Sequence, residues 1–353
     1  MTTFVLESDC AEVAENLGEL AHGFGGKTLV VTGAGGFLGQ YLKGVAAHLN
    51  SHILNDPLSV IALDNFIVSD EAAAQDDGNN HYVMRNHNVI EPIEIEGQVD
   101  FVVHAAGIAS PYHYRAYPLE TLEVATTGTK HMLNLAREKR ARLLFFSSSE
   151  IYGDPDPNHV PTPESYRGNV SCQGPRACYD ESKRLGETLC YVYNTYYGVA
   201  CNSVRPFNVY GPGMRENDYR VLPNFASRIK AGKPLNVYGN GNQTRTYCYV
   251  TDALSGFLRI LLRGVPGETY NIGNPSPEIS VNELANRISS VLGHEVPRNL
   301  IEYPDSYPAD EPNRRCPDIR KARTQLGYEP KVPIEDGLRR FFDWADRQYV
   351  GSV

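Results

Sequence analysis

Residues 31–39 read VTGAGGFLG, and this stretch decides the fold. Gly33, Gly36 and Gly39 follow a short apolar run over 27–33 and open a segment with helical periodicity. In such a loop the first glycine permits a tight turn, the second lets a pyrophosphate approach the backbone, and the third lets the helix pack close to the strand. The free N–H groups and the positive dipole end of the helix then face the phosphates. The stretch therefore predicts a strand, a glycine loop and a helix that together bind a dinucleotide.

The next apolar run, 58–64, predicts a second strand that ends in Asp64. A carboxylate at this place accepts hydrogen bonds from the adenosine ribose and repels a 2′-phosphate, so it favours NAD over NADP. A glycine-rich turn that binds no ligand is the alternative, but a chance glycine pattern would lack the strand, helix and acid found here. The GxxGxxG spacing, which differs from GxGxxG, predicts the short-chain dehydrogenase variety of the fold.

Apolar runs and helical segments alternate as far as Asn208. Apolar runs of this length, separated by helices, indicate parallel strands that are covered on both faces. The further runs lie at 99–107, 141–149 and 200–208, and a long helix is expected at 118–140. The sequence therefore predicts an α/β fold with a doubly wound parallel sheet.

Beyond Asn208 the chain becomes richer in proline and glycine, and the predicted strands become short. This change predicts a smaller C-terminal, substrate-binding lobe beside the sheet, with helices around 221–231, 280–292 and 334–348. The predicted division of the chain is an N-terminal helical extension at 1–26, a dinucleotide domain at 27–206 that also receives about 240–272, and a lobe formed by 207–239 and 273–350.

The first 26 residues carry five acids, no basic start and no apolar core, so a signal peptide is not expected. They indicate instead a short amphipathic helix. Asp9 and Glu12 are expected to form a capping box, and Val13, Leu17 and Leu20 share one face. Packing of that face on the main domain is the expected role.

Composition argues against several classes of partner. The formal net charge is −9 and no run of Lys or Arg resembles a nucleic-acid patch, so a nucleic-acid partner is not expected. No apolar run approaches the roughly 18 residues of a membrane span, so no membrane partner is expected.

Seven scattered cysteines without a CxxC pair indicate a reduced, cytoplasmic protein. Neither the cysteines nor the ten histidines have the spacing of a ligand cluster, so no metal site is expected.

A second stretch, ACYDESKRLGETL at 177–189, places Tyr179 and Lys183 four residues apart in a predicted helix, where they share a face. A free tyrosine has a pKa near 10, and lowering it by about three units requires about 4 kcal/mol of preferential stabilisation of the anion. The neighbouring ammonium and the positive nicotinamide ring of NAD are expected to supply it. Ser148, just past a buried strand, is expected to orient a substrate alcohol. Ordinary surface and core roles for these residues are the alternative.

The glycine spacing, the serine after the fifth strand and YxxxK together resemble the extended short-chain dehydrogenase/reductases, which act largely on nucleotide sugars. Longer segments carry a narrower similarity: SSSEIYGDP, ESYRGNV, GPRACYDESKR, NVYGPGM, PLNVYGNGNQTRTYCYVTD, NIGNP and PDIRKARTQLGYEPKVPIEDGL. These resemble the UDP-glucuronate decarboxylases (UDP-xylose synthases) and the decarboxylase domain of the lipid A aminoarabinose pathway. The resemblance extends from about Lys27 to Arg340.

The resemblance implies an NAD-dependent enzyme that acts on a UDP-sugar as a homodimer, formed through helices near 119–139 and 176–197. It implies catalytic roles for Ser148, Ser149, Glu150, Tyr179, Lys183 and Arg245. Contacts with NAD are implied for Gly33, Gly36, Phe37, Leu38, Gly39, Asp64, Asn65, Asn88, Val89, Ala105, Tyr179 and Lys183. Contacts with the UDP-sugar are implied for Tyr114, Asn208, Tyr238, Arg245 and Arg315, and more weakly for Arg220 and Arg176.

The implied reaction uses one hydride-transfer site. UDP-glucuronate carries its carboxylate on C5, and an alkyl carboxylate does not lose CO₂ easily because the departing electrons have no acceptor. Oxidation at C4 creates a β-keto acid whose carbonyl accepts them. NAD supplies the redox chemistry, and the protein supplies position and electrostatics. Re-reduction then gives UDP-xylose; release of the 4-keto pentose is the other outcome, and the sequence leaves both open.

Positions 148–150 discriminate between related activities. The 4,6-dehydratases carry an Asp–Glu pair after the hydroxyl residue, and Ser149 replaces the Asp that acts as their general acid. In the 4-epimerases the place of Glu150 is usually small or apolar. A UDP-sugar 4-epimerase, another C4-oxidising enzyme of this fold and a non-catalytic dinucleotide sensor remain the alternatives. Three positions depart from the decarboxylase pattern. Ser148 occupies a position where the resembled enzymes have Thr, Asn88 one where they have Asp, and Ala125 one where they have Asn.

Overall fold

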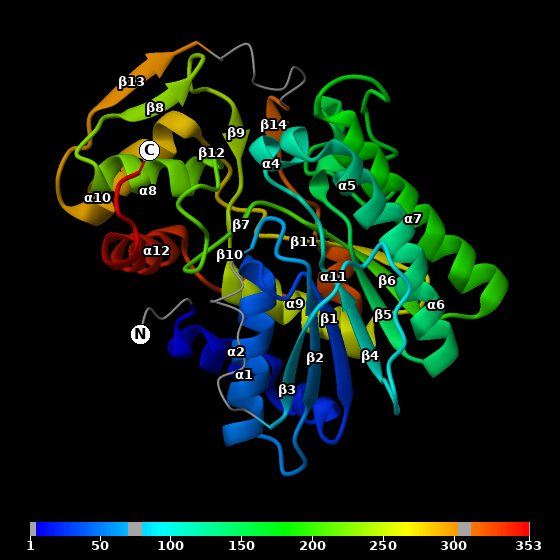
Figure 1. Ribbon diagram of the computed structural model, residues 1–353. Helices are drawn as coiled ribbons and strands as arrows, with labels where there is room; N and C mark the ends of the chain where they lie inside the picture. Colours follow the sequence, from blue (N-terminus) through cyan, green and yellow to red (C-terminus); the bar gives the residue numbers. More distant parts are fainter. Residues whose placement is uncertain (1–4, 70–79, 303–311, 353) are drawn as a thin grey trace.

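The computed structural model describes residues 5–69, 80–302 and 312–352 (Figure 1). A seven-stranded sheet forms the centre of this part of the chain, in the order β3-β2-β1-β4-β5-β6-β11. All neighbouring strands pair in parallel. The strands are β1 Thr28–Thr32, β2 Ser59–Asp64, β3 Tyr82–Asn86, β4 Phe101–His104, β5 Arg142–Phe146, β6 Cys201–Pro206 and β11 Thr269–Ile272. The predicted doubly wound parallel sheet is confirmed.

Strand β1 occupies the middle of the sheet, where Val30 pairs with Ile61 of β2 and with Val102 of β4. The chain adds strands first on one side of β1 and then on the other, which leaves a crevice beyond the carboxyl ends of β1 and β4. Each of the five predicted apolar runs contains one observed strand.

Strand β3 was not predicted. It lies at an edge of the sheet, and of its five residues only Tyr82 is buried, whereas Val83, Arg85 and Asn86 are exposed. An edge strand of this kind has no continuous apolar run, which explains why the sequence pattern missed it.

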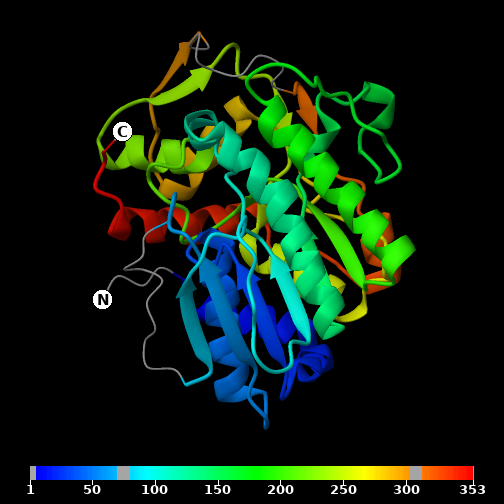
Figure 2. The same ribbon diagram turned by 45° about the vertical axis from the view of Figure 1, so that its right-hand side comes forward.

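Helices cover both faces of the sheet. Leu29 and Val31 join a buried cluster with α1, α2 and α9, whereas Val30 joins a separate cluster with α6 and α7. This alternation follows from the period of two in a β-strand. In Figure 2 the cyan-green α5–α6 segment and the green α7 lie together in front of the sheet. These helices are α1 Glu7–Leu17, α2 Phe37–His52, α5 Pro118–Glu123, α6 Thr129–Lys139, α7 Ala177–Tyr197 and α9 Val250–Arg263.

The predicted long helix at 118–140 is helical throughout but changes pitch. A π-helical turn at Val124–Gly128 joins α5 to α6. Ala125 lies buried in this turn. Its carbonyl lies close to Gly186 of α7, where an added Cβ would stand 3.0 Å from that oxygen, so the two helices pack closely at this point.

The C-terminal lobe contains the three expected helices, α8 Val221–Lys230, α10 Val281–Leu292 and α12 Ile334–Gln348. Short strands complete it: β7 Val209–Tyr210 pairs with β10 Cys248–Tyr249, β8 Leu235–Tyr238 with β13 Arg298–Ile301, and β9 Thr244–Arg245 with β12 Ile279–Ser280 and β14 Arg314–Arg315. Two further helices are α4 Pro111–Ala116 and α11 Arg320–Leu326. Within the three described ranges, no helix has both the length and the apolarity to cross a membrane.

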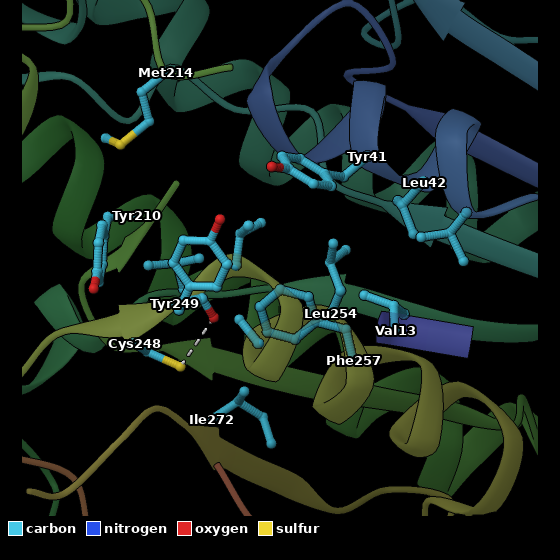
Figure 3. Close-up of a cluster of buried hydrophobic side chains, with 14 of the residues drawn as sticks. Val13, Tyr41, Leu42, Tyr210, Met214, Cys248, Tyr249, Leu254, Phe257 and Ile272 are labelled. Carbon is cyan, nitrogen blue, oxygen red and sulfur yellow. Dashed lines mark hydrogen bonds between the residues drawn. The ribbon is translucent and has the colours of Figure 1, made fainter. Parts of the chain in front are cut away.

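The N-terminal helix α1 packs on the main domain, as predicted. Val13 and Leu17 are buried, and Val13 lies in the apolar cluster shown in Figure 3. The predicted capping box is wrong, because α1 begins at Glu7 without a side-chain cap. Asp9 lies inside the helix and cannot serve as its N-cap.

Asp9 is instead a fully buried acceptor. The hydroxyls of Tyr41 and Tyr249 donate to its Oδ2 at 2.8 and 2.9 Å. Arg340 of α12 donates to its Oδ1 at 3.3 Å. One carboxylate therefore connects α1 with α2, with β10 and with the last helix of the lobe. This network gives the N-terminal extension a structural role.

Candidate active site

Two adjoining hollows lie beyond the carboxyl ends of β1, β4 and β5. One has a volume of about 540 Å³ and the other about 490 Å³. Phe37, Leu38 and Ala105 line both, so the hollows meet at the start of α2. We call the larger one the Glu150 pocket and the smaller one the Gly33 pocket, after a residue that lines each.

The two pockets divide the predicted site residues between them. The Gly33 pocket is lined by Gly33, Gly36, Phe37, Leu38, Gly39, Asp64, Asn65, Asn88, Val89 and Ala105. The Glu150 pocket is lined by Tyr114, Ser148, Ser149, Glu150, Arg176, Tyr179, Lys183, Asn208, Arg220, Tyr238, Arg245 and Arg315. Every residue for which the sequence implied a catalytic, NAD-binding or sugar-binding role therefore lines one of the two joined hollows.

The glycine loop has the shape that a diphosphate requires. Gly33 has a φ of +71°, and a Cβ there would stand 2.8 Å from the backbone of Ala106. At Gly39 a Cβ would collide with the carbonyl oxygen of Gly33. Helix α2 begins just after Gly36 without a side-chain cap, so its first N–H groups and positive dipole end point toward the Gly33 pocket. These features fit the phosphates of a dinucleotide.

Asp64 ends β2 at the wall of the same pocket. Its Oδ2 accepts a hydrogen bond from the amide of Gly35 at 2.8 Å. Its Oδ1 accepts from the amide of Phe66 and from the Ser69 hydroxyl, both at 2.8 Å. An ionised carboxylate has about four acceptor positions, so the carboxylate retains capacity for a ribose hydroxyl.

Tyr179 lies in the first turn of α7, where it is buried and stacks on Tyr114 with 5.6 Å between ring centroids. Burial raises the pKa of its phenol to about 12, a hydrogen bond with Ser148 acts in the opposite direction, and the charge of Glu150 adds to the rise. Desolvation of the anion outweighs the nearby Arg220 cation, so the pKa of the phenol is raised in the protein alone. The lowering expected from Lys183 together with the positive nicotinamide ring of NAD stays a prediction.

Lys183 lies one turn further along the same helix face. Its Nζ donates to the carbonyl of Phe146 at 2.7 Å and lies 5.8 Å from the Tyr179 ring centroid. Burial lowers the pKa of this amine to about 8. The end of β5 thus fixes the lysine beside the tyrosine.

Glu150 lies in a short 3₁₀ turn, Ser149–Tyr152, directly after β5. Arg315 donates to both of its carboxylate oxygens, at 2.5 and 2.7 Å, and Arg176 donates to Oε2. Burial alone would raise the pKa of this acid, but the guanidiniums of Arg315 and Arg176 lower it to about 2. Glu150 is therefore a paired carboxylate inside the pocket and not a solvated acid at the end of a strand.

Two further arginines line the Glu150 pocket and contact protein groups as well. Arg245 donates to the carbonyls of Thr244 and Pro312 at 2.8 and 2.6 Å. The Nε of Arg220 donates to Asp218 Oδ1 at 2.8 Å. The pocket therefore holds several guanidiniums in fixed positions, which suits an anionic ligand.

Comparison with known proteins decides the family. Residues 29–273 match the NAD dependent epimerase/dehydratase family. The chain belongs to this family. It is 40% identical over 333 residues to UDP-glucuronic acid decarboxylase 1 of Xenopus tropicalis, a match that covers 92% of this chain and 75% of that protein.

Two further proteins are similar to this chain. UDP-glucuronic acid decarboxylase 3 of Arabidopsis thaliana is 38% identical over 311 residues, which cover 88% of this chain and 86% of that one. The solved structure of DesIV, a dTDP-glucose 4,6-dehydratase of Streptomyces venezuelae with NAD and TYD bound, is similar with a TM-score of 0.78 at 25% identity. That similarity covers 91% of this chain and 97% of DesIV.

The departures from the decarboxylase pattern have different surroundings. Asn88 lines the Gly33 pocket, and its Oδ1 accepts the amide of Ile90 at 3.3 Å. Ser148 keeps a hydroxyl beside Tyr179. Ala125 lines neither pocket and lies buried in the π-helical turn. The presence of Ala125, where the decarboxylase pattern has Asn, therefore concerns how α5–α6 packs on α7 and not the lining of either pocket.

Sequence reasoning underrated Arg176 and missed Asp180. Arg176 directly precedes α7 and Asp180 lies in its first turn, next to Tyr179. Arg176 lies 3.5 Å from Asp180 and also contacts Glu150. The spacing of four residues between them was a readable signal of a shared helix face. Their connection to Glu150 was not readable, because it depends on how β5 meets α7.

A separate group of possible metal ligands lies on the surface. Glu7, His48 and His52 place ligand atoms within 4.8 Å of one another. His48 Nδ1 and Glu7 Oε1 share a hydrogen bond at 2.7 Å, which accounts for their approach without an ion. Both histidines lie toward the far end of α2 from the pockets. The spacing of residues in the sequence did not reveal this group, because Glu7 lies on α1 whereas the two histidines lie on α2.

Proposed function

We propose that this protein is an NAD-dependent decarboxylase of UDP-glucuronate. One arrangement carries the proposal: Tyr179 and Lys183 line the same pocket as the ion-paired Glu150. Lys183 also lies beside Gly107, which lines both pockets. Identity of about 40% with UDP-glucuronic acid decarboxylases over 92% of the chain supports the same reaction. The Gly33 pocket is proposed to hold NAD, and the Glu150 pocket the UDP-sugar.

Bound NAD supplies a reversible hydride acceptor and, when oxidised, a positive ring that stabilises a phenolate. Tyr179 is proposed to take the proton of the C4 hydroxyl, and Ser148 to orient that hydroxyl. The phenol needs this added stabilisation, because burial holds its pKa at about 12 in the protein alone. Lys183, fixed by the Phe146 carbonyl, adds positive charge on the same side.

Loss of CO₂ follows from the ketone at C4. The C5–carboxylate bond breaks, its electron pair enters the C4 carbonyl as an enolate, and C5 then takes up a proton. Return of the hydride to C4 gives UDP-xylose. Glu150, with a pKa of about 2, is a permanent anion at neutral pH. Its proposed role is therefore to fix Arg315 and Arg176 around the sugar and not to donate a proton.

The arginines are proposed to bind the anionic parts of the substrate. Arg315 and Arg220 suit the diphosphate, and Arg245 suits the sugar carboxylate, since a planar guanidinium contacts either group with two donors. Tyr114, Asn208 and Tyr238 line the same pocket and are proposed to contact the nucleotide and the sugar. Ser149, buried at the place of the dehydratase acid, offers no carboxyl group for the elimination of water.

The deciding experiment mixes the protein, NAD and UDP-glucuronate and measures CO₂ together with the mass of the nucleotide-sugar product. UDP-xylose or its 4-keto precursor with one equivalent of CO₂ supports the proposal. UDP-galacturonate without gas would make the protein a 4-epimerase. NAD binding with no product at all would make it a dinucleotide sensor.

A homodimer is proposed through α5–α6 and α7. These helices expose large apolar side chains, namely Leu119, Leu122, Leu185, Tyr191, Tyr196 and Tyr197. An exposed apolar surface of this kind is typical of a protein interface. Light scattering should give twice the chain mass, and Tyr196→Asp should shift it toward the monomer. A monomeric wild-type protein would contradict the dimer.

The compartment and the domain division are proposals as well. All seven cysteines are free, which supports a reduced, cytoplasmic setting. We retain the division into an extension at 1–26, a dinucleotide domain at 27–206 with about 240–272, and a lobe at 207–239 and 273–350. The position of β11 in the large sheet and of α8, α10 and α12 outside it supports this division.

A further inference from the structure

Asp180 is a buried acid next to the proposed catalytic tyrosine. Only 5% of its surface is exposed. Its Oδ2 lies 3.5 Å from Arg176 Nε, whereas its Oδ1 accepts no hydrogen bond within the described ranges. Asp180 does not line the Glu150 pocket, but Arg176 does. Any influence of this acid on a ligand therefore passes through Arg176.

Arg176 connects two acids. It donates to Glu150 on one side and faces Asp180 on the other. The groups that interact electrostatically with Asp180 include Glu150 after β5, Arg315 of β14, Tyr179 and Cys178 of its own helix, and Arg176 just before that helix. Protonation of Asp180 therefore removes one negative charge from this end of the pocket.

The surroundings of Asp180 place its ionisation in the neutral range. Burial raises the pKa of the carboxyl most, the neighbouring Glu150 anion raises it further, and Arg176 and Arg315 oppose the rise, with a result of about 7. The raised pKa agrees with the geometry: Oδ1 accepts no hydrogen bond within the described ranges, and an ionised oxygen without a donor is poorly stabilised. Small changes in nearby charge therefore change its protonation.

We propose that Asp180, acting through Arg176, determines how strongly the Glu150 pocket binds a sugar that carries a negative charge. With Asp180 ionised, its negative charge offsets part of the attraction that Arg176 exerts on a sugar carboxylate. With Asp180 neutral, that offset is absent and the carboxylate is bound more strongly. This role rests on the proposed function, since it presumes that a uronic acid sugar enters this pocket.

The test measures binding and needs no turnover. Dissociation constants for UDP-glucuronate and UDP-glucose are determined by calorimetry with NAD present, in a Tyr179→Phe background. At about pH 8, above the Asp180 pKa of about 7, Asp180→Asn should bind UDP-glucuronate roughly tenfold more tightly, the effect of one unit charge at pocket distance. Binding of UDP-glucose, which shares the diphosphate but lacks the sugar carboxylate, should tighten by less than about threefold.

The pH dependence supplies a second reading that needs no Asp180 variant. Lys183 of the same pocket, with a pKa of about 8, begins to lose its charge in this range and affects both sugars. With Asp180 intact, affinity for UDP-glucuronate should therefore show a several-fold fall beyond that of UDP-glucose as the pH rises from about 6 to about 8. Asp180→Asn should remove that fall, and Asp180→Glu should restore it. Glu181→Gln, which removes an acid from the same helix outside both pockets, should leave it in place.

Equal shifts for both sugars, or a level pH profile for UDP-glucuronate, would overturn the proposal and make Asp180 a purely structural residue. Failure of the proposed function has a different signature. It would appear in the wild-type protein as the absence of CO₂ from UDP-glucuronate, in an assay that this binding experiment does not use.

Discussion

The N-terminal helix holds a fully buried carboxylate and the Glu150 pocket a partly buried one, and the two are stabilised by different partners. Asp9 is fully buried and accepts from two tyrosine hydroxyls, with Arg340 at the edge of hydrogen-bond distance. Burial remains the largest influence, so the pKa of Asp9 is raised. Glu150 contacts two guanidiniums directly, and its pKa falls to about 2.

The difference shows that partners, more than burial, decide the charge of an acid. Hydroxyl donors satisfy a carboxylate without neutralising it, whereas guanidiniums do both. Asp9 joins segments that are far apart in the chain and faces no pocket. Glu150 positions cations inside one. We therefore expect changes near Asp9 to alter stability, and changes near Glu150 to alter chemistry.

The largest expected effect is in the pocket. Tyr179→Phe removes the proton acceptor, so kcat should fall by about a thousandfold or more, which is about 4 kcal/mol of barrier. NAD affinity and thermal stability should change little, and stopped assays with calorimetry measure all three. Tyr191→Phe, an exposed change on the same helix, is the matched control. Near-wild-type turnover by Tyr179→Phe would refute the assigned acid–base role.

Glu150→Gln should have the next largest effect. The amide has only one acceptor oxygen for Arg315 and Arg176, so their positions relax and CO₂ release should slow by about a hundredfold. NAD binding, measured by fluorescence titration, should change less than twofold. Equal losses in CO₂ release and NAD binding would show that Glu150 is a structural residue after all, and the contrast with Asp9 would fail.

Asp9→Ala tests the other side of the comparison. It leaves the buried hydroxyls of Tyr41 and Tyr249 without an acceptor, so unfolding should become easier by about 2 kcal/mol in urea titrations. The kcat of the folded protein should stay within twofold of wild type. Asp343→Ala, an exposed change on α12, is the control. A large fall in kcat without a change in stability would reverse the assignment of roles.

Asp9 also predicts a pH dependence. Its folded pKa is raised above the unfolded value, mainly by burial. A raised pKa means that its contribution to stability is fully present below the unfolded pKa of about 4 and is lost as the pH rises through the folded pKa. Asp9→Asn cannot ionise, so its stability relative to wild type should improve over that rise. Parallel stability–pH curves for the two proteins would contradict the raised pKa.

The smallest effect is expected in the lobe, at a group in neither region. The Ser280 hydroxyl caps α10 by accepting the amide of Glu283 at 3.1 Å. Ser280→Ala should cost about 1 kcal/mol in the free energy of unfolding and leave kcat unchanged. Ser290→Ala, an exposed site on the same helix, should be neutral. A loss equal to that of Asp9→Ala would show that the N-terminal network is no stronger than an ordinary helix cap.

Much of the fold was predictable because its signals are local. The glycine loop, the apolar strands and the helices of the lobe each depend on backbone conformation or side-chain period within a short window. Strand β3 was not predicted, because its position at the edge of the sheet leaves it half-exposed and without a continuous apolar run. The capping box at Asp9 failed because the polar pattern of a helix start matches that of a buried acid, and only the positions of Tyr41 and Tyr249 distinguish the two.

The sequence by itself determined the parallel sheet, the glycine loop and the shared face of Tyr179 and Lys183, since these depend on near neighbours in the chain. Tertiary structure alone decided the charges. Glu150 is paired because Arg315, 165 positions away, reaches it, and Tyr179 has a raised pKa because the fold buries it. Ionisation depends on desolvation and on charges a few ångströms away in space, and distance along the chain does not report either one.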